Sequence, residues 1–130
     1  MLRTTCLLPV IHRAWPDARI TWLTRPASVP LLQNNPYVHE IVAYGPDALL
    51  HLSTRRHDQV INLDASKTST ALAQMARAGE KIGYIMDDHG IVRATNPAGE
   101  EWLRMGVFDD LKKKNSRTYQ SIMCSILGVP

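Results

Sequence analysis

The chain has 130 residues, of which 45% are hydrophobic and 21% are charged, and this is the size and composition of one compact globular domain. Its net charge of +3 suits an anionic partner but does not choose between nucleic acid, phospholipid and phosphorylated sugar. No uncharged apolar run approaches the roughly 18 residues that cross a bilayer, and the N-terminus lacks a secretion signal, so neither a transmembrane segment nor export is expected.

The first half of the chain predicts alternating helices and strands. Apolar residues from Arg3 to Trp15 recur at spacings of one, three and four, which predicts a helix that Pro16 ends. Pro, Gly and Asn turns separate the next segments. The expected elements are a strand over Arg19–Thr24, a short helix from Pro26 to Leu32, a strand over Val38–Tyr44 and a helix over Ala48–Thr54.

The second half continues the pattern. Asp58–Asp64 has the apolar centre of a strand covered on both faces, and Ser66–Ala78 predicts a helix closed by Gly79. The run Lys112–Lys114 is expected to be a solvated surface turn. The other expected elements are a strand over Lys81–Ile85, a polar, turn-rich segment over Asp87–Gly99, and helices over Glu100–Met105 and Arg117–Leu127.

Strands that alternate with helices predict an α/β fold, a Rossmann-like parallel sheet with helices on both faces. Such sheets bind ligands at the carboxyl ends of their strands. A doubly wound domain usually starts with a strand that becomes central, whereas this chain starts with a helix. We therefore expect residues 1–130 to form a single domain whose first strand is missing.

Several segments, in order, carry a family resemblance. LRTTCLLPVIHRAWPDARITWLTRPASVPLLQNNPYVHEIVAY resembles the opening of glycosyltransferase family 9, the ADP-heptose:lipopolysaccharide heptosyltransferases. HDQVINLDASKTSTALAQMARAGEKIGY resembles a later strand, loop and helix of the same family, and NSRTYQSIMCSILGVP resembles the helix that closes its first domain. The motif positions read Leu2-Arg3-Thr4-Thr5, Pro16-Asp17-Ala18 and Asn35-Pro36-Tyr37-Val38-His39.

The resemblance implies a fragment of a cytoplasmic two-domain enzyme of GT-B architecture. The family transfers heptose from ADP-heptose to the lipopolysaccharide inner core with inversion, uses no further cofactor, and binds the nucleotide sugar in a second domain that this chain lacks. By this alignment the catalytic Asp, in a Gly-Asp turn, would precede Met1, so the fragment is expected to be inactive alone. The implied partners are the core acceptor and, peripherally, the inner face of the inner membrane, but not nucleic acid.

The segment from Asp64 to Thr68 is one candidate acceptor or anion site. It joins a strand to a helix, so Asp64, Ser66, Lys67 and Thr68 would lie at the carboxyl edge of the sheet, beside the positive end of the helix dipole. Lys67 could bind a phosphate or carboxylate of the acceptor. The alternative is that Ser66 only caps the helix and Lys67 is solvated.

Arg3, Thr4 and Thr5 open the first helix and are further candidates for binding the acceptor or the donor phosphates. Alternatively, a threonine caps that helix and Arg3 belongs to a frayed terminus. Arg25 directly follows a strand and is a similar candidate. We further hypothesise that Arg3 and Lys67 share one groove for a phosphorylated saccharide.

No metal site is expected. Cys6 and Cys124 lack CxxC spacing, which favours two reduced, buried thiols, and the five histidines form no i, i+4 pair. One other function stays open, a non-catalytic module that binds an anionic glycolipid or phosphosugar through the Lys67 loop. A receiver-like or nucleotide-binding domain is disfavoured, because the chain has neither an early acidic pair nor a GxGxxG loop.

Overall fold

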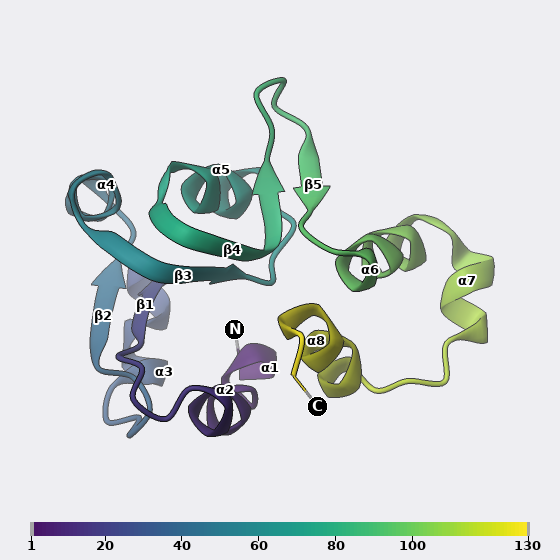
Figure 1. Cartoon of the computed structure of the whole chain (residues 1–130), viewed down its shortest axis with the longest axis horizontal. Coiled ribbons are helices and arrows are strands. Elements are labelled where there is room, and N and C mark those ends of the chain that lie inside the picture. Colours follow the sequence, from purple (N-terminus) through teal and green to yellow (C-terminus); the bar gives the residue numbers. More distant parts are fainter. Residues whose placement is uncertain (1, 130) are drawn as a thin grey trace. The chain divides into compact units, whose positions relative to one another are not determined.

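The structure, a computed structural model, describes residues 2–129, and side chains from residue 4 onward. The chain divides into two compact units, Met1–Thr54 and Arg55–Pro130, and each is described by itself. Both units combine helices with a parallel strand pair (Figure 1), so the predicted α/β class is confirmed. That the whole chain forms one domain stays a prediction.

The first unit is built around one parallel strand pair. Strand β1 (Thr21–Thr24) pairs with β2 (Glu40–Ala43), with Thr21 opposite Glu40 and Thr24 opposite Ala43. The crossover between them contains the 3-10 helix η1 (Pro26–Ser28) and α3 (Val29–Leu32). The other helices are α1 (Leu2–Thr5), α2 (Leu8–Ala14) and α4 (Pro46–Thr54). The buried apolar side chains of this unit are Leu7, Leu8, Leu32, Ala48 and Leu52.

The helix predicted from Arg3 to Trp15 is interrupted. Two helices, α1 and α2, are separated at Cys6 and Leu7, because Pro9 has no N–H to donate and its ring crowds the carbonyl four residues earlier. The end of the helix was predicted correctly. Helix α2 ends at Ala14, and the N–H of Trp15 donates to the carbonyl of Ile11 at 2.9 Å.

The second unit contains a three-stranded mixed sheet. Strand β3 (Arg56–Asn62) is parallel to β4 (Arg77–Met86), and β4 is antiparallel to β5 (Val92–Ala94). Helix α5 (Lys67–Met75) packs on β3 and β4, and α8 (Tyr119–Leu127) lies on the opposite side of the sheet (Figure 1). The remaining helices are α6 (Pro97–Val107) and α7 (Asp109–Lys114).

The predicted helix Ser66–Ala78 ends early, and Gly79 does not close it. Helix α5 ends at Met75, Ala76 is already extended with ψ 136°, and Gly79 lies within β4. The physical reason is strand pairing, because Arg77 joins the ladder opposite Arg56. A Cβ on Gly79 would lie 3.3 Å from the carbonyl oxygen of Asp58, so the glycine serves close strand packing there.

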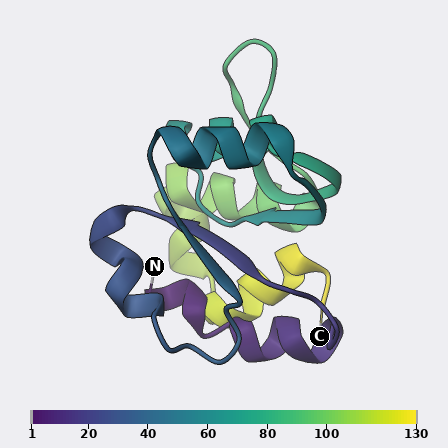
Figure 2. The same cartoon turned by 90° about the vertical axis from the view of Figure 1, so that its left-hand side faces the viewer.

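Strand β5 lies where the sequence predicted only turns. Asp87 makes the hairpin, since its Oδ1 accepts from the N–H groups of His89 and Ile91, both at 2.9 Å. Its Oδ2 accepts from Arg93 Nε at 2.9 Å. These donors, the N–H of Ile91 and then the Arg93 guanidinium, hold the pKa of Asp87 below its usual value. The hairpin tip extends away from the sheet (Figure 2).

Tyr84 connects the sheet of the second unit to α6. Its side chain is fully buried, and its hydroxyl donates to the carbonyl of Gly99 at 2.9 Å. Burial raises the pKa of Tyr84 well above the ordinary tyrosine value, with smaller contributions from Tyr119 and Glu100.

Trp102 on α6 meets Tyr119 on α8 edge to face, with ring centroids 6.0 Å apart. Helix α8 also packs through its buried apolar side chains, which are Ile122, Met123, Ile126 and Leu127.

Candidate functional site

Four of the residues predicted from the sequence lie together at the end of β3. Asp64 follows the strand, Ser66 is the N-cap of α5, and Lys67 and Thr68 form its first turn. Because β3 and β4 are parallel, this loop lies at the carboxyl edge of that strand pair, as the sequence predicted. We refer to residues 62–70 as the β3–α5 loop.

The carboxylate of Asp64 is used inside the β3–α5 loop. Its Oδ1 accepts from the N–H of Ser66 at 3.1 Å, and its Oδ2 accepts from the Ser66 hydroxyl at 3.2 Å. The Ser66 hydroxyl in turn accepts from the N–H of Ser69 at 3.2 Å. Asp64 therefore orients the N-cap and brings a negative charge to the positive end of the helix dipole. This arrangement is a structural cap, and an incoming anion would meet that charge.

Asn62 fixes the base of the loop. Its Nδ2 donates to the carbonyls of Asp64 and Tyr84, both at 2.9 Å, and its Oδ1 accepts from the N–H of Asp64 at 3.1 Å. Opposite it, Gly83 has φ 105°, and a Cβ there would lie 1.9 Å from the carbonyl oxygen of Asn62. The N–H of Gly83 donates to the Thr95 hydroxyl at 2.8 Å. Only glycine fits this crossing of β3 and β4.

Lys67 and Thr68 are the loop residues with groups to offer a ligand. Both are exposed, and among residues 4–129 the Lys67 ammonium makes no hydrogen bond or ion pair. Thr70, by contrast, is fully buried and donates to the carbonyl of Ser66 at 2.8 Å. The loop therefore presents one cation and one hydroxyl from a rigid base, which suits binding of a phosphate or carboxylate better than proton transfer.

The remaining predicted site residues belong to the first unit. Thr4 and Thr5 lie within α1 rather than at its N-cap, and the carbonyl of Thr4 accepts from the N–H of Leu7 at 3.0 Å. Arg25 is exposed and directly follows β1, as predicted. The side chain of Arg3 lies outside the described residues, so the shared groove of Arg3 and Lys67 stays a hypothesis.

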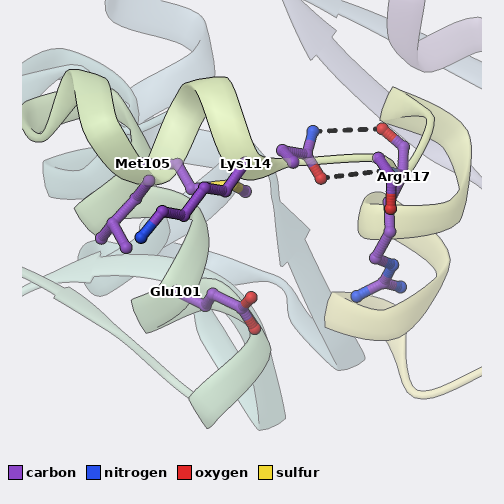
Figure 3. A pocket seen from close by; sticks show the side chains of 7 residues that line it. Glu101, Met105, Lys114 and Arg117 are labelled. Atoms are coloured by element: carbon purple, nitrogen blue, oxygen red, sulfur yellow. Dashed lines mark hydrogen bonds between the residues drawn. The ribbon is translucent and has the colours of Figure 1, made fainter.

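A second candidate is an open pocket of about 250 Å³ in the second unit. It lies between the end of α6, α7 and the segment before α8 (Figure 3). Its one signal in the sequence is the basic run Lys112–Lys114. This run lies in α7 and is exposed as expected, although it is helical rather than a turn. The residues that line the pocket are Glu101, Met105, Leu111, Lys114, Asn115, Ser116 and Arg117.

Two of the polar residues that line this pocket, Asn115 and Arg117, are already hydrogen-bonded within the unit. Asn115 Nδ2 donates to the carbonyl of Arg117 at 3.1 Å, and its Oδ1 accepts from the N–H of Arg117 at 3.0 Å. The Arg117 guanidinium runs along α8, where it donates to the carbonyl of Ser121 at 3.0 Å and to the hydroxyl of Ser125. The pocket therefore has no nucleophile paired with a base, and it resembles a surface hollow more than a catalytic centre.

Comparison with protein-family models, with curated proteins and with solved structures gives no match for this chain. What the chain does must therefore be argued from its own residues.

Within the described part of the chain, no cluster of three or more His, Cys, Asp or Glu side chains could hold a metal ion. Neither cysteine is in a disulfide, but Cys6 is exposed and Cys124 only half-buried, so the expectation of two buried thiols is wrong. Cys6 is exposed because it lies in the link between α1 and α2. Among the described helices, none is long and apolar enough to cross a membrane.

Proposed function

We propose that this chain is the acceptor-side part of a family 9 glycosyltransferase, which transfers heptose from ADP-heptose to the lipopolysaccharide inner core. The ordered sequence resemblance from Leu2 to Tyr84 motivates the proposal. In this proposal both units belong to one Rossmann-like half of a GT-B enzyme.

The observation that carries the proposal is the pairing of the strands. In a doubly wound sheet of order 3-2-1-4-5, the second strand pairs with the third and the fourth with the fifth, each pair in parallel. The pairs β1–β2 and β3–β4 follow this scheme, and each is joined by a helical crossover. Parallel pairs with helical crossovers are the unit from which such sheets are built.

The β3–α5 loop supports an acceptor role for this part of the enzyme. The inner core is anionic, and Lys67 offers an exposed ammonium group at the carboxyl edge of the β3–β4 pair. Because Asp64 and Ser66 already cap α5, an acceptor phosphate would bind through the side chains of Lys67 and Thr68 rather than through bare helix N–H groups.

The proposed reaction is inversion at the anomeric carbon of ADP-heptose. An acceptor hydroxyl forms the new C–O bond as the bond to ADP breaks, and a carboxylate takes the hydroxyl proton. Both oxygens of Asp64 accept bonds from Ser66, so we assign Asp64 to capping rather than to this role. The resemblance gives the role to the Asp of the Gly-Asp turn, for which this chain has no matching residue.

Isothermal titration of the chain with phosphorylated inner-core oligosaccharide tests the proposal. We expect saturable binding that Lys67→Ala weakens on the order of tenfold, because one charge-assisted contact is lost. The matched control is Arg19→Gln, a charge removed from an exposed residue before β1, and it should leave binding unchanged. Absence of binding, or equal binding by Lys67→Ala, would contradict the proposal.

A second titration separates an acceptor site from a non-catalytic module that binds anionic glycolipid. An acceptor site contacts the hydroxyl that receives heptose, so an oligosaccharide that already carries this heptose should bind more weakly than the acceptor itself. A module that recognises only phosphates should bind both oligosaccharides equally. Equal binding would therefore favour the module over the transferase.

A further inference from the structure

The segment that joins α6 to α8 exposes apolar side chains in an unusual concentration. Residues 106–118 are all exposed. Within five positions, Val107 is 76% exposed, Phe108 54% and Leu111 36%. Single exposed apolar residues are ordinary, but a cluster beside charged groups marks an interaction surface. We refer to residues 104–114 as the α6–α7 segment, which lies at the outer end of α6 (Figure 1).

Phe108, Leu111 and Lys112 lie on one side of the first turn of α7. The N–H of Lys112 donates to the carbonyl of Phe108 at 3.2 Å, which continues the turn from Phe108 into α7. Leu111 and Lys112 therefore follow Phe108 at the spacings of three and four that put helical residues on one face. Lys114 follows Leu111 at the same spacing of three.

The charges of the segment favour an anionic partner. Four basic residues, Arg104 and Lys112–Lys114, outnumber Asp109 and Asp110, which leaves a net charge of +2. The two acids lie in the first turn of α7 and the lysines in its last, where each stabilises the helix dipole. Within the described residues no ion pair holds the lysines, so their ammonium groups remain available to a partner.

We propose that the α6–α7 segment binds the surface of an anionic phospholipid bilayer. Lys112–Lys114 contact the lipid phosphates, and Val107, Phe108 and Leu111 enter the boundary between headgroups and acyl chains. Basic residues beside exposed large apolar ones are typical of helices that lie in this boundary. Nucleic acid would use the lysines but would leave the apolar side chains in water. The family resemblance already implies contact with the inner membrane. This inference adds the segment that makes the contact, and it is argued from exposed side chains rather than from sugar transfer.

Vesicle sedimentation with the full chain tests the inference. We expect binding to vesicles of phosphatidylcholine mixed with phosphatidylglycerol, weakened by added salt, and no binding to phosphatidylcholine alone. Lys112→Gln and Lys113→Gln should each lower the partition coefficient about fivefold. Phe108→Ser and Val107→Ser should each lower it at least fivefold, because each withdraws an apolar side chain from the bilayer boundary.

Two matched controls remove the same kinds of side chain elsewhere. Leu50→Ser replaces a leucine of α4 that is 63% exposed, and Arg19→Gln removes a basic charge before β1. Both should leave vesicle binding unchanged. Because every substituted side chain is exposed, far-ultraviolet circular dichroism of each variant should match that of the wild type.

Three outcomes would overturn the inference. The first is binding that is absent or independent of anionic lipid. The second is binding that depends on the lysines but not on Phe108 and Val107, which means simple charge attraction without insertion. The third is self-association, measured by sedimentation velocity, that Phe108→Ser abolishes while vesicles bind no protein. In that case a second copy of the chain covers the surface.

Discussion

The β3–α5 loop and the α6–α7 segment lie in the same unit and use polar residues in opposite ways. In the loop, the side chains of Asn62, Asp64, Ser66 and Thr70 all bond to neighbouring groups of the loop or of β4. In the α6–α7 segment, the lysines and the three exposed apolar side chains have solvent as their surroundings. The polar side chains of the β3–α5 loop hold its conformation, whereas the side chains of the α6–α7 segment are available to a partner.

A cluster of polar residues in a sequence can therefore stabilise the fold or face a partner. The Asp64–Thr68 segment has the residue types of an anion site, yet most of its groups stabilise the fold and only Lys67 and Thr68 reach outward. Among the side chains of residues 4–129, the lysine run of α7 finds no such partners. Substitutions should therefore lower stability in the first region and leave it unchanged in the second.

The largest loss of stability is expected for Gly83→Ala, at the base of the β3–α5 loop. A Cβ would lie 1.9 Å from the carbonyl oxygen of Asn62, and φ is 105°, so β3 and β4 must separate. We expect the free energy of unfolding to fall by about 3 kcal/mol or more, measured by urea denaturation. Gly90→Ala is the matched control, because its φ of 76° is also positive but nothing lies within 4 Å, and it should cost about 1–2 kcal/mol. Equal losses would contradict the crowding argument.

Tyr84→Phe should produce the next largest loss, about 1–2 kcal/mol, because the buried carbonyl of Gly99 loses its donor. The pH dependence supplies a second measurement. The folded-state pKa of Tyr84 is raised above the ordinary 10.0, so its contribution is complete below pH 10.0 and is lost as the pH rises above it. The difference in unfolding free energy between wild type and Tyr84→Phe should therefore be constant below pH 10.0 and shrink above it. A constant difference at all pH values would refute this assignment.

Ser66→Ala should cost about 1 kcal/mol, because the N–H of Ser69 loses its cap and Asp64 loses its hydroxyl donor. Ser53→Ala is the control, since the exposed Ser53 hydroxyl donates to the carbonyl of Leu49 within α4 and is not a helix cap. Its effect should stay within about 0.5 kcal/mol. Thermal denaturation of both variants gives the comparison, and equal shifts in Tm would contradict the capping role of Ser66.

The sequence predicted the order of elements better than their ends. The apolar pattern of the sequence, together with its Pro, Gly and Asn turns, located β1, β2, β3 and α8. It extended α5 to Ala78, because Ala76 and Ala78 continue a helical pattern and nothing local indicates that Arg77 pairs with Arg56. Pairing between distant residues decided that boundary.

In the candidate site, too, the sequence predicted local features better than features that depend on contacts between distant residues. The loop at the carboxyl end of β3 follows from local sequence and was predicted, and the N-cap role of Ser66 was one of the two alternatives that the sequence left open. Strand β5 was missed because Val92–Ala94 is short and is held by Asp87, whose three hydrogen bonds have no signature in composition. The exposure of Phe108 could not be predicted either, since an apolar residue between two helices usually indicates burial.

Phe108→Ser should have the smallest effect on stability. The side chain is 54% exposed, and Phe108 is the N-cap of α7 without a side-chain cap, so serine would supply a cap in place of an apolar surface group. The free energy of unfolding should change by no more than about 0.5 kcal/mol. Ile126→Ala, which empties a fully buried position on α8, should cost about 2–5 kcal/mol in the same urea denaturation. If Phe108→Ser destabilised the chain as much as Ile126→Ala, Phe108 would belong to the core and would not be available to a lipid surface. An unchanged stability would mean that the fold does not require an aromatic side chain there and that Phe108 is available to a partner.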